Sequence, residues 1–205
     1  MTSNIRAIIF DFGGVLIGWE PHRVYRRFFD DPDETAAFLA EIGFAEWNAK
    51  QDAGRPFAEG VAELSARFPQ HAHLIRAYHE HWEDSITGPI PGSVELVRAL
   101  KRRGIAVYGL SNWSAETFPL VQEKYEVFGL LDGYIISGNV GLAKPDPAIF
   151  QILLEGVGRP ASECLLIDDA PTNIETARQL GFETILFRSP GALRIELLRL
   201  GLLDS

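Results

Sequence analysis

Cysteine is nearly absent from this chain, since Cys164 is the only one among 205 residues. A single cysteine excludes an intrachain disulfide framework and a paired-thiol redox site. Long apolar runs are missing too, because no stretch approaches the roughly 20 apolar residues that a membrane-spanning helix needs. The first apolar run contains Asp11, which is unlike the core of a signal peptide. We therefore expect a cytoplasmic protein that binds no membrane.

Positive charge is scarce as well. The chain has 19 lysines and arginines against 28 aspartates and glutamates, so its formal net charge is −9 and its pI is near 5.0. Proteins that bind nucleic acid or anionic membranes need clusters of basic groups that neutralise phosphates. The charge balance excludes both kinds of partner, and any phosphate that the chain binds must be met by a local site.

Apolar residues, in contrast, are spread along the whole length. Hydrophobic residues make up 46% of the chain and charged residues 23%, and no Ser-, Gly- or Pro-rich run resembles a disordered linker. A chain of this size can bury one substantial core. We expect one core with a smaller insertion, in a monomer or a homodimer.

Short apolar runs alternate with helical patterns over most of the chain. The apolar runs cover residues 6–10, 105–110, 134–137, 164–167 and 184–187. The helical patterns cover residues 93–103, 115–125, 147–157, 173–180 and 192–200. This alternation predicts the α/β class, with a doubly wound, Rossmann-like parallel sheet that helices cover on both faces.

The stretch at 18–87 breaks this alternation. It contains helical patterns but no convincing strand, and the Asp-Pro pair at 31–32 is typical of a helix N-terminus. Glycines and prolines at 88–92 indicate a hinge back into the sheet. We predict a small α-helical cap domain at 18–87, inserted into a core domain formed by 1–17 and 88–205.

Aromatic and aliphatic side chains are frequent in this predicted cap. At helical spacing such residues pack between helices more often than they stack on a ligand. The sequence leaves open whether Trp19 and Trp47 face the cap interior or a ligand. We expect the cap core to contain Phe28, Phe29, Phe38, Leu39, Phe44, Trp47, Phe57, Leu64, Phe68, Leu74, Tyr78 and Trp82.

Polar residues follow three of the predicted strands, and a lysine precedes one of the helices. They are Asp11, the pair Ser111–Asn112, the pair Asp168–Asp169, and Lys144. The carboxyl ends of parallel strands meet at one edge of a sheet, so these side chains converge although they are far apart in the chain. Acidic groups, a hydroxyl, an amide and a lysine together predict a site for a phosphate dianion and a divalent metal ion.

Four short motifs carry a resemblance to a known family. They are DFGGV at 11–15, LSN at 110–112, GLAKPDP at 141–147 and IDD at 167–169, the last followed by Asn173. In this order, with a helical insert after the first, they resemble the motifs of the haloacid dehalogenase superfamily of hydrolases, and in particular its bacterial sugar-phosphate phosphatases. The match spans positions 7 to 187. The resemblance implies a doubly wound core whose helical cap opens and closes over the active site.

The resemblance implies a nucleophile and a metal site. Asp11 would attack a phosphoryl group to give an aspartyl phosphate, which water then hydrolyses. A magnesium ion that bridges the carboxylate and the phosphate would remove their mutual repulsion. Asp11 and Asp168 would supply two ligands and the carbonyl of Gly13 a third, while Asp169 would orient a metal-bound water.

The same resemblance implies a phosphate-binding set. Lys144 and Ser111 would hold the phosphate oxygens during catalysis, and Asn112 and Gly14 would add substrate contacts. Asn173 is expected to begin a helix or to act as a structural hydrogen-bonder. The favoured function is a magnesium-dependent phosphatase for a small phosphorylated metabolite, such as a sugar phosphate.

One position departs from the family pattern. Phosphatases of this superfamily usually carry an acid–base aspartate two residues after the nucleophile, and here that residue is Gly13. Such a group is worth roughly 10² to 10⁴ in rate. Either the substrate needs little acid assistance, or a cap residue or a water supplies the proton. Glu20 and His22 are the candidate donors near the cap hinge.

Two other functions stay open. A 2-haloacid dehalogenase needs neither a metal nor a leaving-group proton, but that subgroup usually has a serine where Asp168 stands. Asp168 and Asp169 beside a carboxylate nucleophile also require a cation, which argues against this activity. The other alternative is a module that binds phosphorylated metabolites with little turnover.

Overall fold

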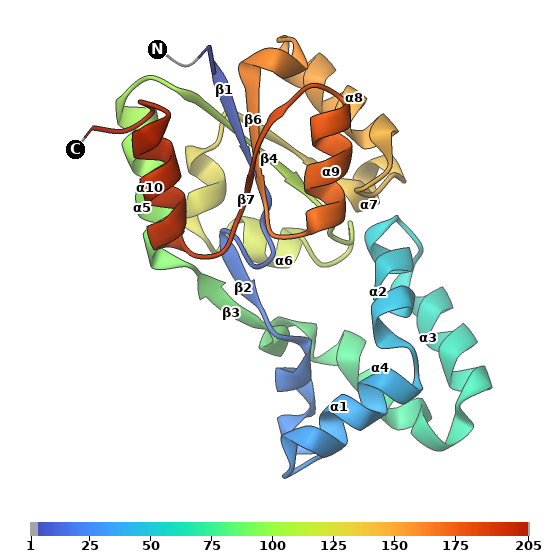
Figure 1. The fold of residues 1–205 in the computed structure, drawn as a ribbon. Helices are drawn as coiled ribbons and strands as arrows, with labels where there is room; N and C mark the ends of the chain where they lie inside the picture. Colours follow the sequence, from blue (N-terminus) through green and yellow to red (C-terminus); the bar gives the residue numbers. More distant parts are fainter. Residues whose placement is uncertain (1–3, 205) are drawn as a thin grey trace.

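The computed structural model describes residues 4–204. These residues form a main sheet of five parallel strands in the order β5-β4-β1-β6-β7. The chain starts at the centre of the sheet and winds first to one edge and then to the other, so the predicted doubly wound α/β fold is confirmed (Figure 1). The strands are β1 (Ala7–Phe10), β4 (Ala106–Ser111), β5 (Gly133–Ile136), β6 (Cys164–Asp168) and β7 (Glu183–Leu186).

The central strand β1 shows how the sheet builds a core on each face. All four of its residues are buried. Ile8 and Phe10 belong to one hydrophobic cluster, whereas Ala7 and Ile9 belong to another. Successive side chains of a strand point to opposite faces. An uninterrupted apolar strand therefore requires a layer of helices on both sides.

Four helices supply these layers. Two of them pack on the face that carries Ile8 and Phe10, and the other two pack on the opposite face (Figure 1). The first pair is α5 (Pro91–Arg102) and α10 (Pro190–Arg199), and the second is α8 (Pro147–Val157) and α9 (Pro171–Gln179).

No helix among the described residues is long and apolar enough to cross a bilayer.

The segment predicted as one helix at 115–125 is not a continuous helix. Only α6 (Pro119–Gln122) is α-helical there, and the 3₁₀ helix η4 (Glu126–Leu130) follows. Pro119 has no backbone N–H to donate to the preceding turn, and it stands at the start of α6, where that donor is not needed. Two further short pieces are α7 (Ser137–Val140), directly after β5, and η5 (Ala161–Glu163), directly before β6.

The helical insert begins and ends on an antiparallel ribbon. Strands β2 (Ile17–Trp19) and β3 (Ile86–Pro89) pair with each other. The expectation that residues 18–87 contain no strand is therefore wrong at both ends. A Cβ at Gly18 would lie 2.0 Å from Oγ1 of Thr87, so a larger residue there would force the Thr87 side chain to move. Strands this short, interrupted by glycine and proline, carry no periodic signal.

Between the ribbon strands the chain is helical, as predicted. Asp31 caps the first α-helix, because its Oδ1 accepts from the N–H of Asp33 at 2.9 Å. The insert is thus confirmed as a helical region, while its division into a separate domain stays a prediction. In this fully described segment the elements are η1 (Pro21–Arg27), α1 (Pro32–Glu41), α2 (Phe44–Asp52), α3 (Phe57–Arg67), η2 (Pro69–His71), α4 (Ala72–Glu80) and η3 (Trp82–Ser85).

Aromatic rings fill the interior of the insert. The rings of Phe44 and Tyr78 meet edge to face with their centroids 4.8 Å apart, and Tyr25 meets Phe38 at 5.1 Å. Most of the predicted cap core is buried or partly buried, but Phe28 is 41% exposed. Tyr25, three residues earlier, fills the interior position, so the prediction for Phe28 is wrong.

Candidate active site

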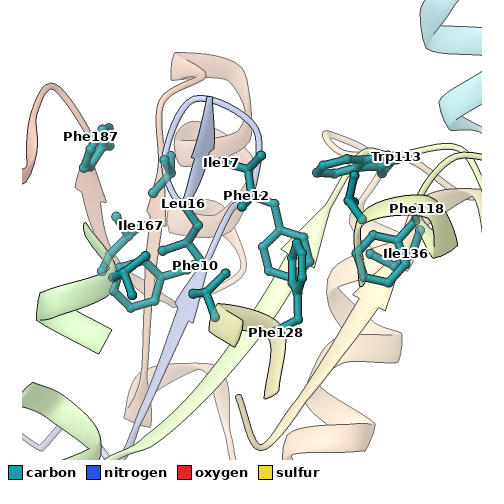
Figure 2. Close-up of a cluster of buried hydrophobic side chains, with 14 of the residues drawn as sticks. Phe10, Phe12, Leu16, Ile17, Trp113, Phe118, Phe128, Ile136, Ile167 and Phe187 are labelled. Carbon is teal, nitrogen blue, oxygen red and sulfur yellow. The ribbon is translucent and has the colours of Figure 1, made fainter. Parts of the chain in front are cut away.

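Asp11 lies at the carboxyl end of the central strand. Its N–H donates to the carbonyl of Ile167 on β6 at 2.9 Å, and its Oδ1 accepts from the N–H of Phe12 at 2.6 Å. The Phe12 ring is fully buried and meets Phe128 edge to face at 5.0 Å (Figure 2). A Cβ at Gly109 would lie 2.3 Å from this ring, so the neighbouring strand needs glycine there. A packed ring therefore fixes the loop that carries Asp11.

Lys144 connects two of the acidic groups. Its buried Nζ donates to the carbonyl of Leu110 at 2.8 Å and lies 2.6 Å from Oδ2 of Asp168 and 3.0 Å from Oδ1 of Asp11. An ammonium group has three donors, so this arrangement occupies all of them. Burial alone would lower the pKa of Lys144, but the attraction of Asp11 and Asp168 outweighs it and raises the pKa above its usual value.

Asn112 holds the loop that carries Lys144. Its Nδ2 donates to the carbonyl of Lys144, and its Oδ1 accepts from the N–H of the same residue, both at 2.8 Å. Two hydrogen bonds to one residue fix the backbone from which the lysine side chain extends. Its predicted contact with substrate stays a prediction beside this positioning contact.

Asp168 ends β6 and is fully buried. Its Oδ1 accepts from the N–H of Ala170 at 2.9 Å, and Nδ2 of Asn173 lies 3.0 Å from both carboxylate oxygens. Asn173 therefore acts as the structural hydrogen-bonder that the sequence indicates. These contacts orient the carboxylate toward Lys144.

Negative charge exceeds positive charge in this cluster. Carboxylate oxygens of Asp11, Asp168 and Asp169 lie within 4.8 Å of one another, and Lys144 contacts the first two of them. Burial raises the pKa of Asp11 to about 7, an effect that Lys144 opposes and Asp168 reinforces. Burial and the charge of Asp168 also raise the pKa of Asp169. A divalent cation would remove this repulsion, so the donor set fits magnesium.

Ser111 adds an unsatisfied hydroxyl beside the cluster. It ends β4 and is 1% exposed, and its Oγ has no hydrogen-bond partner among the described residues. A buried polar atom without a partner costs free energy. A ligand that is rich in oxygen would satisfy it, which supports the predicted phosphate contact.

The glycine pair after Asp11 forms a tight turn. Gly14 has a φ of 74°, and its N–H donates to the carbonyl of Ile17 at 2.8 Å. A Cβ at Gly14 would lie 2.8 Å from Oδ2 of Asp169, so a side chain there would displace this carboxylate. The predicted roles of the Gly13 carbonyl as a metal ligand and of Gly14 in substrate binding stay predictions.

A small cavity of about 50 Å³ borders this cluster. Gly13 and Asn112 line it; Gly13 lies on the loop that carries Asp11, and Asn112 directly follows β4 and hydrogen-bonds to the backbone of Lys144. The cavity thus lies where the sheet edge meets the insert. The other lining residues are Trp113 and Thr117 from the core, Trp19 from the ribbon, and Asn48, Asp52 and Trp82 from the insert.

A family model of haloacid dehalogenase-like hydrolases matches residues 5–181. The protein belongs to this family. This hydrolase is 26% identical over 196 residues to a sesquiterpene phosphatase of Aspergillus oryzae. The match covers 88% of this chain and 89% of that protein. It is also 32% identical over 199 residues to a drimenol cyclase of Aspergillus calidoustus. That match covers 94% of this chain but spans only 36% of the larger protein.

The fold of the hydrolase is similar to that of bt-2542, a HAD family enzyme from Bacteroides thetaiotaomicron. The magnesium complex of that enzyme matches with a TM-score of 0.72 at 23% identity, over 96% of this chain and all (100%) of that one. Its complex with magnesium and inorganic phosphate matches with a TM-score of 0.67 at 22% identity, over 90% and 95% of the two chains. The likeness shows a shared fold.

The donors predicted near the hinge of the hydrolase do not line the cavity. Oε2 of Glu20 pairs with Nε2 of His22 at 3.5 Å, and His22 lines a separate hollow of about 540 Å³ on the insert. Neither residue is among the described residues that line the small cavity. Of the two tryptophans left open, Trp19 lines the cavity, whereas Trp47 is buried and donates to the carbonyl of Gly60 at 2.8 Å.

Two polar cavity residues of the hydrolase were not predicted. Asn48 and Asp52 lie four residues apart on α2, which places them on one face of the helix. Nδ2 of Asn48 donates to Oδ2 of Asp52 at 2.9 Å. The spacing of this pair is visible in the sequence, but the direction that the face points depends on how the insert docks on the core.

Proposed function

We propose that this hydrolase is a magnesium-dependent phosphatase that acts on a small phosphorylated metabolite through an aspartyl phosphate. The observation that carries the proposal is the contact of Lys144 with both Asp11 and Asp168, inside a cluster with surplus negative charge. The related sesquiterpene phosphatase and the magnesium- and phosphate-bound bt-2542 enzyme support it.

The carboxylates of Asp11, Asp168 and Asp169 are the groups that would hold magnesium, together with the carbonyl of Gly13. Hard oxygen donors of this kind suit the ion. When bound, magnesium neutralises the repulsion between carboxylate and phosphate and polarises the phosphorus. Asp168 keeps its orientation through the N–H of Ala170, so its position does not depend on the ion.

Asp11 is oriented by contacts to one of its two oxygens. Oδ1 accepts from the N–H of Phe12 and contacts Nζ of Lys144, so we assign the attack on phosphorus to Oδ2. The bond from Oδ2 to phosphorus forms while the bond from phosphorus to the alcohol oxygen breaks. Water then attacks the aspartyl phosphate, which releases phosphate and restores Asp11.

Ser111 and Lys144 stabilise the phosphate in this proposal. The buried hydroxyl of Ser111 can donate to a phosphate oxygen. The three donors of Lys144 already have partners, so one contact is exchanged when a phosphate oxygen binds. Its positive charge acts throughout, because it lies where negative charge develops. Asn112 contributes by fixing the backbone of Lys144.

The cavity restricts the alcohol part of the substrate. Three indole rings line it, from Trp19, Trp82 and Trp113, and Asn48 and Asn112 add amide groups. We therefore propose a compact alcohol with an apolar face, a requirement that some sugar phosphates and short branched alkyl phosphates meet. A 2-haloacid is disfavoured, because dehalogenation needs no metal, whereas the carboxylates of Asp11, Asp168 and Asp169 together require a cation.

A panel of phosphate esters, including sugar 1-phosphates, measured with and without magnesium tests this proposal. We expect phosphate release that depends on magnesium, and a loss of about 10³-fold or more in Asp11→Asn. A melting temperature at least equal to that of the wild type would show that the variant is folded. Release that survives in Asp11→Asn, or no release from any ester, contradicts the proposal. Chloride release from 2-chloropropionate without magnesium would favour the dehalogenase alternative.

A further inference from the structure

The turn that carries Asp11 offers no acid at the position where one is expected. Gly13 lines the cavity, and a Cβ built on it meets no other atom within 4 Å. Its φ is not positive, so other residues can adopt its backbone conformation. The space for an acid–base side chain is therefore present on the core side of the cavity, but the side chain is not.

Asp52 brings a carboxyl group to the same cavity from the insert. It is the last residue of α2 and lines the cavity together with Gly13. Among the described residues that line this cavity, it is the only one with a titratable side chain. Its Oδ2 accepts from Nδ2 of Asn48 at 2.9 Å, and the backbone of Ser114 also hydrogen-bonds to the carboxyl group.

The turn after Asp52 is docked on the core, beside α7 (Figure 1). The hydroxyl of Ser137 donates to the main-chain carbonyl of Asp52, and the N–H of Phe57 donates to Oε1 of Glu116 at 2.9 Å. A Cβ at Gly54 would lie 3.2 Å from the carbonyl of Gly138, so the two backbones approach closely here. These contacts hold Asp52 at the cavity.

We propose that Asp52 is the general acid and base of the phosphatase reaction, in place of the aspartate that is missing at position 13. As the bond between phosphorus and the alcohol oxygen breaks, the electron pair stays on that oxygen, which takes the proton of Asp52. The Asp52 carboxylate then removes a proton from the water that attacks the aspartyl phosphate, and the electron pair of the broken bond returns to Asp11. The inference rests on the proposed phosphatase function.

The environment of Asp52 agrees with this role. Burial raises the pKa of Asp52 to about 7; the hydrogen bond from the backbone of Ser114 opposes the shift, and the negative charge of Asp11 reinforces it. A carboxyl group with a pKa near neutrality can both give and take a proton at the pH of a neutral solution.

Aryl phosphates whose leaving groups have rising pKa values test this role. We expect a shallow dependence of kcat/KM on leaving-group pKa in the wild type and a steep one in Asp52→Asn. The variant should lose about 10²- to 10⁴-fold with the poorest leaving group, where proton donation matters most, and little with the best. Adding Gly13→Asp to Asp52→Asn should restore at least part of the loss and flatten the dependence again.

Ser137→Ala is the matched control, because it removes a docking contact of Asp52 without changing a cavity side chain. It should lower kcat/KM by a similar factor for every aryl phosphate and leave the dependence on leaving-group pKa unchanged. If Asp52→Asn loses the same factor with every leaving group, so that its dependence on leaving-group pKa equals that of the wild type, the inference is wrong.

Two outcomes keep the inference separate from the proposed function. If the wild type releases phosphate but Asp52→Asn keeps the same dependence of kcat/KM on leaving-group pKa, only the role of Asp52 is contradicted. If no ester releases phosphate, the proposed function itself is contradicted. Should Asp52→Asn fail to fold, Gly13→Asp alone gives an answer. If Asp52 already donates the proton, a second acid should leave the dependence of kcat/KM on leaving-group pKa unchanged. A flatter dependence in Gly13→Asp than in the wild type would therefore overturn the inference.

Discussion

The charged cluster at the sheet edge and the insert side of the cavity differ in how their polar groups are held. Lys144 and Asp168 are buried and make hydrogen bonds to loops and strand ends of the core itself. Asp52 lies on a helix of the insert, and its position depends on docking contacts to Ser137 and Ser114. The cluster is thus built into the core, whereas the insert contributes its carboxyl only when it is docked.

A substitution of Lys144, the buried cation of the charged cluster, has the largest expected effect. Lys144→Met leaves buried carboxylates without their partner, so we expect a loss of about 3–5 kcal/mol in the free energy of unfolding, measured by urea denaturation. Without Lys144 the native carboxyls bind protons more tightly than the unfolded chain does, so the variant should be less stable at pH 8 than at pH 5. Millimolar magnesium should recover part of the loss.

The control for this prediction is an exposed lysine. Lys124 pairs with Glu83 at 3.4 Å, and both side chains are about half exposed. Lys124→Met should change the free energy of unfolding by less than about 1 kcal/mol. Equal losses in the two variants would mean that the buried cluster has no special dependence on its cation.

Separating the insert from the core has an intermediate expected effect. Gly54 has a φ of 102°, and a Cβ there would approach the carbonyl of Gly138 at 3.2 Å, so Gly54→Ala should disfavour docking. If the added methyl group costs the docking of the insert about 1.4 kcal/mol, kcat/KM should fall about tenfold. Gly43→Ala is the matched control, because Gly43 also has a positive φ, of 66°, but open space around its Cβ position. A similar loss of activity in both variants would assign the effect to backbone strain.

Changes on the outer surface of the insert should have the smallest effect. Phe28 is 41% exposed, so Phe28→Ala should lower the free energy of unfolding by less than about 1 kcal/mol. Phe57 is 1% exposed, and truncating it to alanine should cost about 3–5 kcal/mol. Urea denaturation of both variants compares the two positions. A loss at Phe28 as large as that at Phe57 would contradict the exposed position of its ring.

The core of the fold could be predicted because its signals are local. Strands β1, β4 and β6 are apolar runs that end at polar residues, and the rule that parallel strand ends converge is enough to bring Asp11 and Asp168 together. The ribbon could not be predicted, because strands β2 and β3 are short and depend on the fit of Gly18 against Thr87. The break at Pro119 was visible in the sequence, but the prediction gave more weight to the surrounding helical pattern.

The contribution of the insert could not be predicted for a different reason. The four-residue spacing of Asn48 and Asp52 places them on one face of α2, but nothing local decides whether that face meets solvent, the aromatic interior or the core. Glu20 and His22 follow the first motif closely in the chain, yet neither of them lines the cavity. Nearness in the chain is therefore a poor guide to residues that reach a site from an inserted region.

The glycine at position 109 has a consequence for how variants of this enzyme are interpreted. Gly109 is on β4, opposite Phe10, and belongs to none of the four motifs. Even alanine there would press on the Phe12 ring and so shift the residue next to Asp11. A loss of activity caused by a change at Gly109 would resemble damage to Asp11, although the altered residue lies outside the cluster of charged side chains. A search for harmful substitutions that inspects only motif residues would miss it.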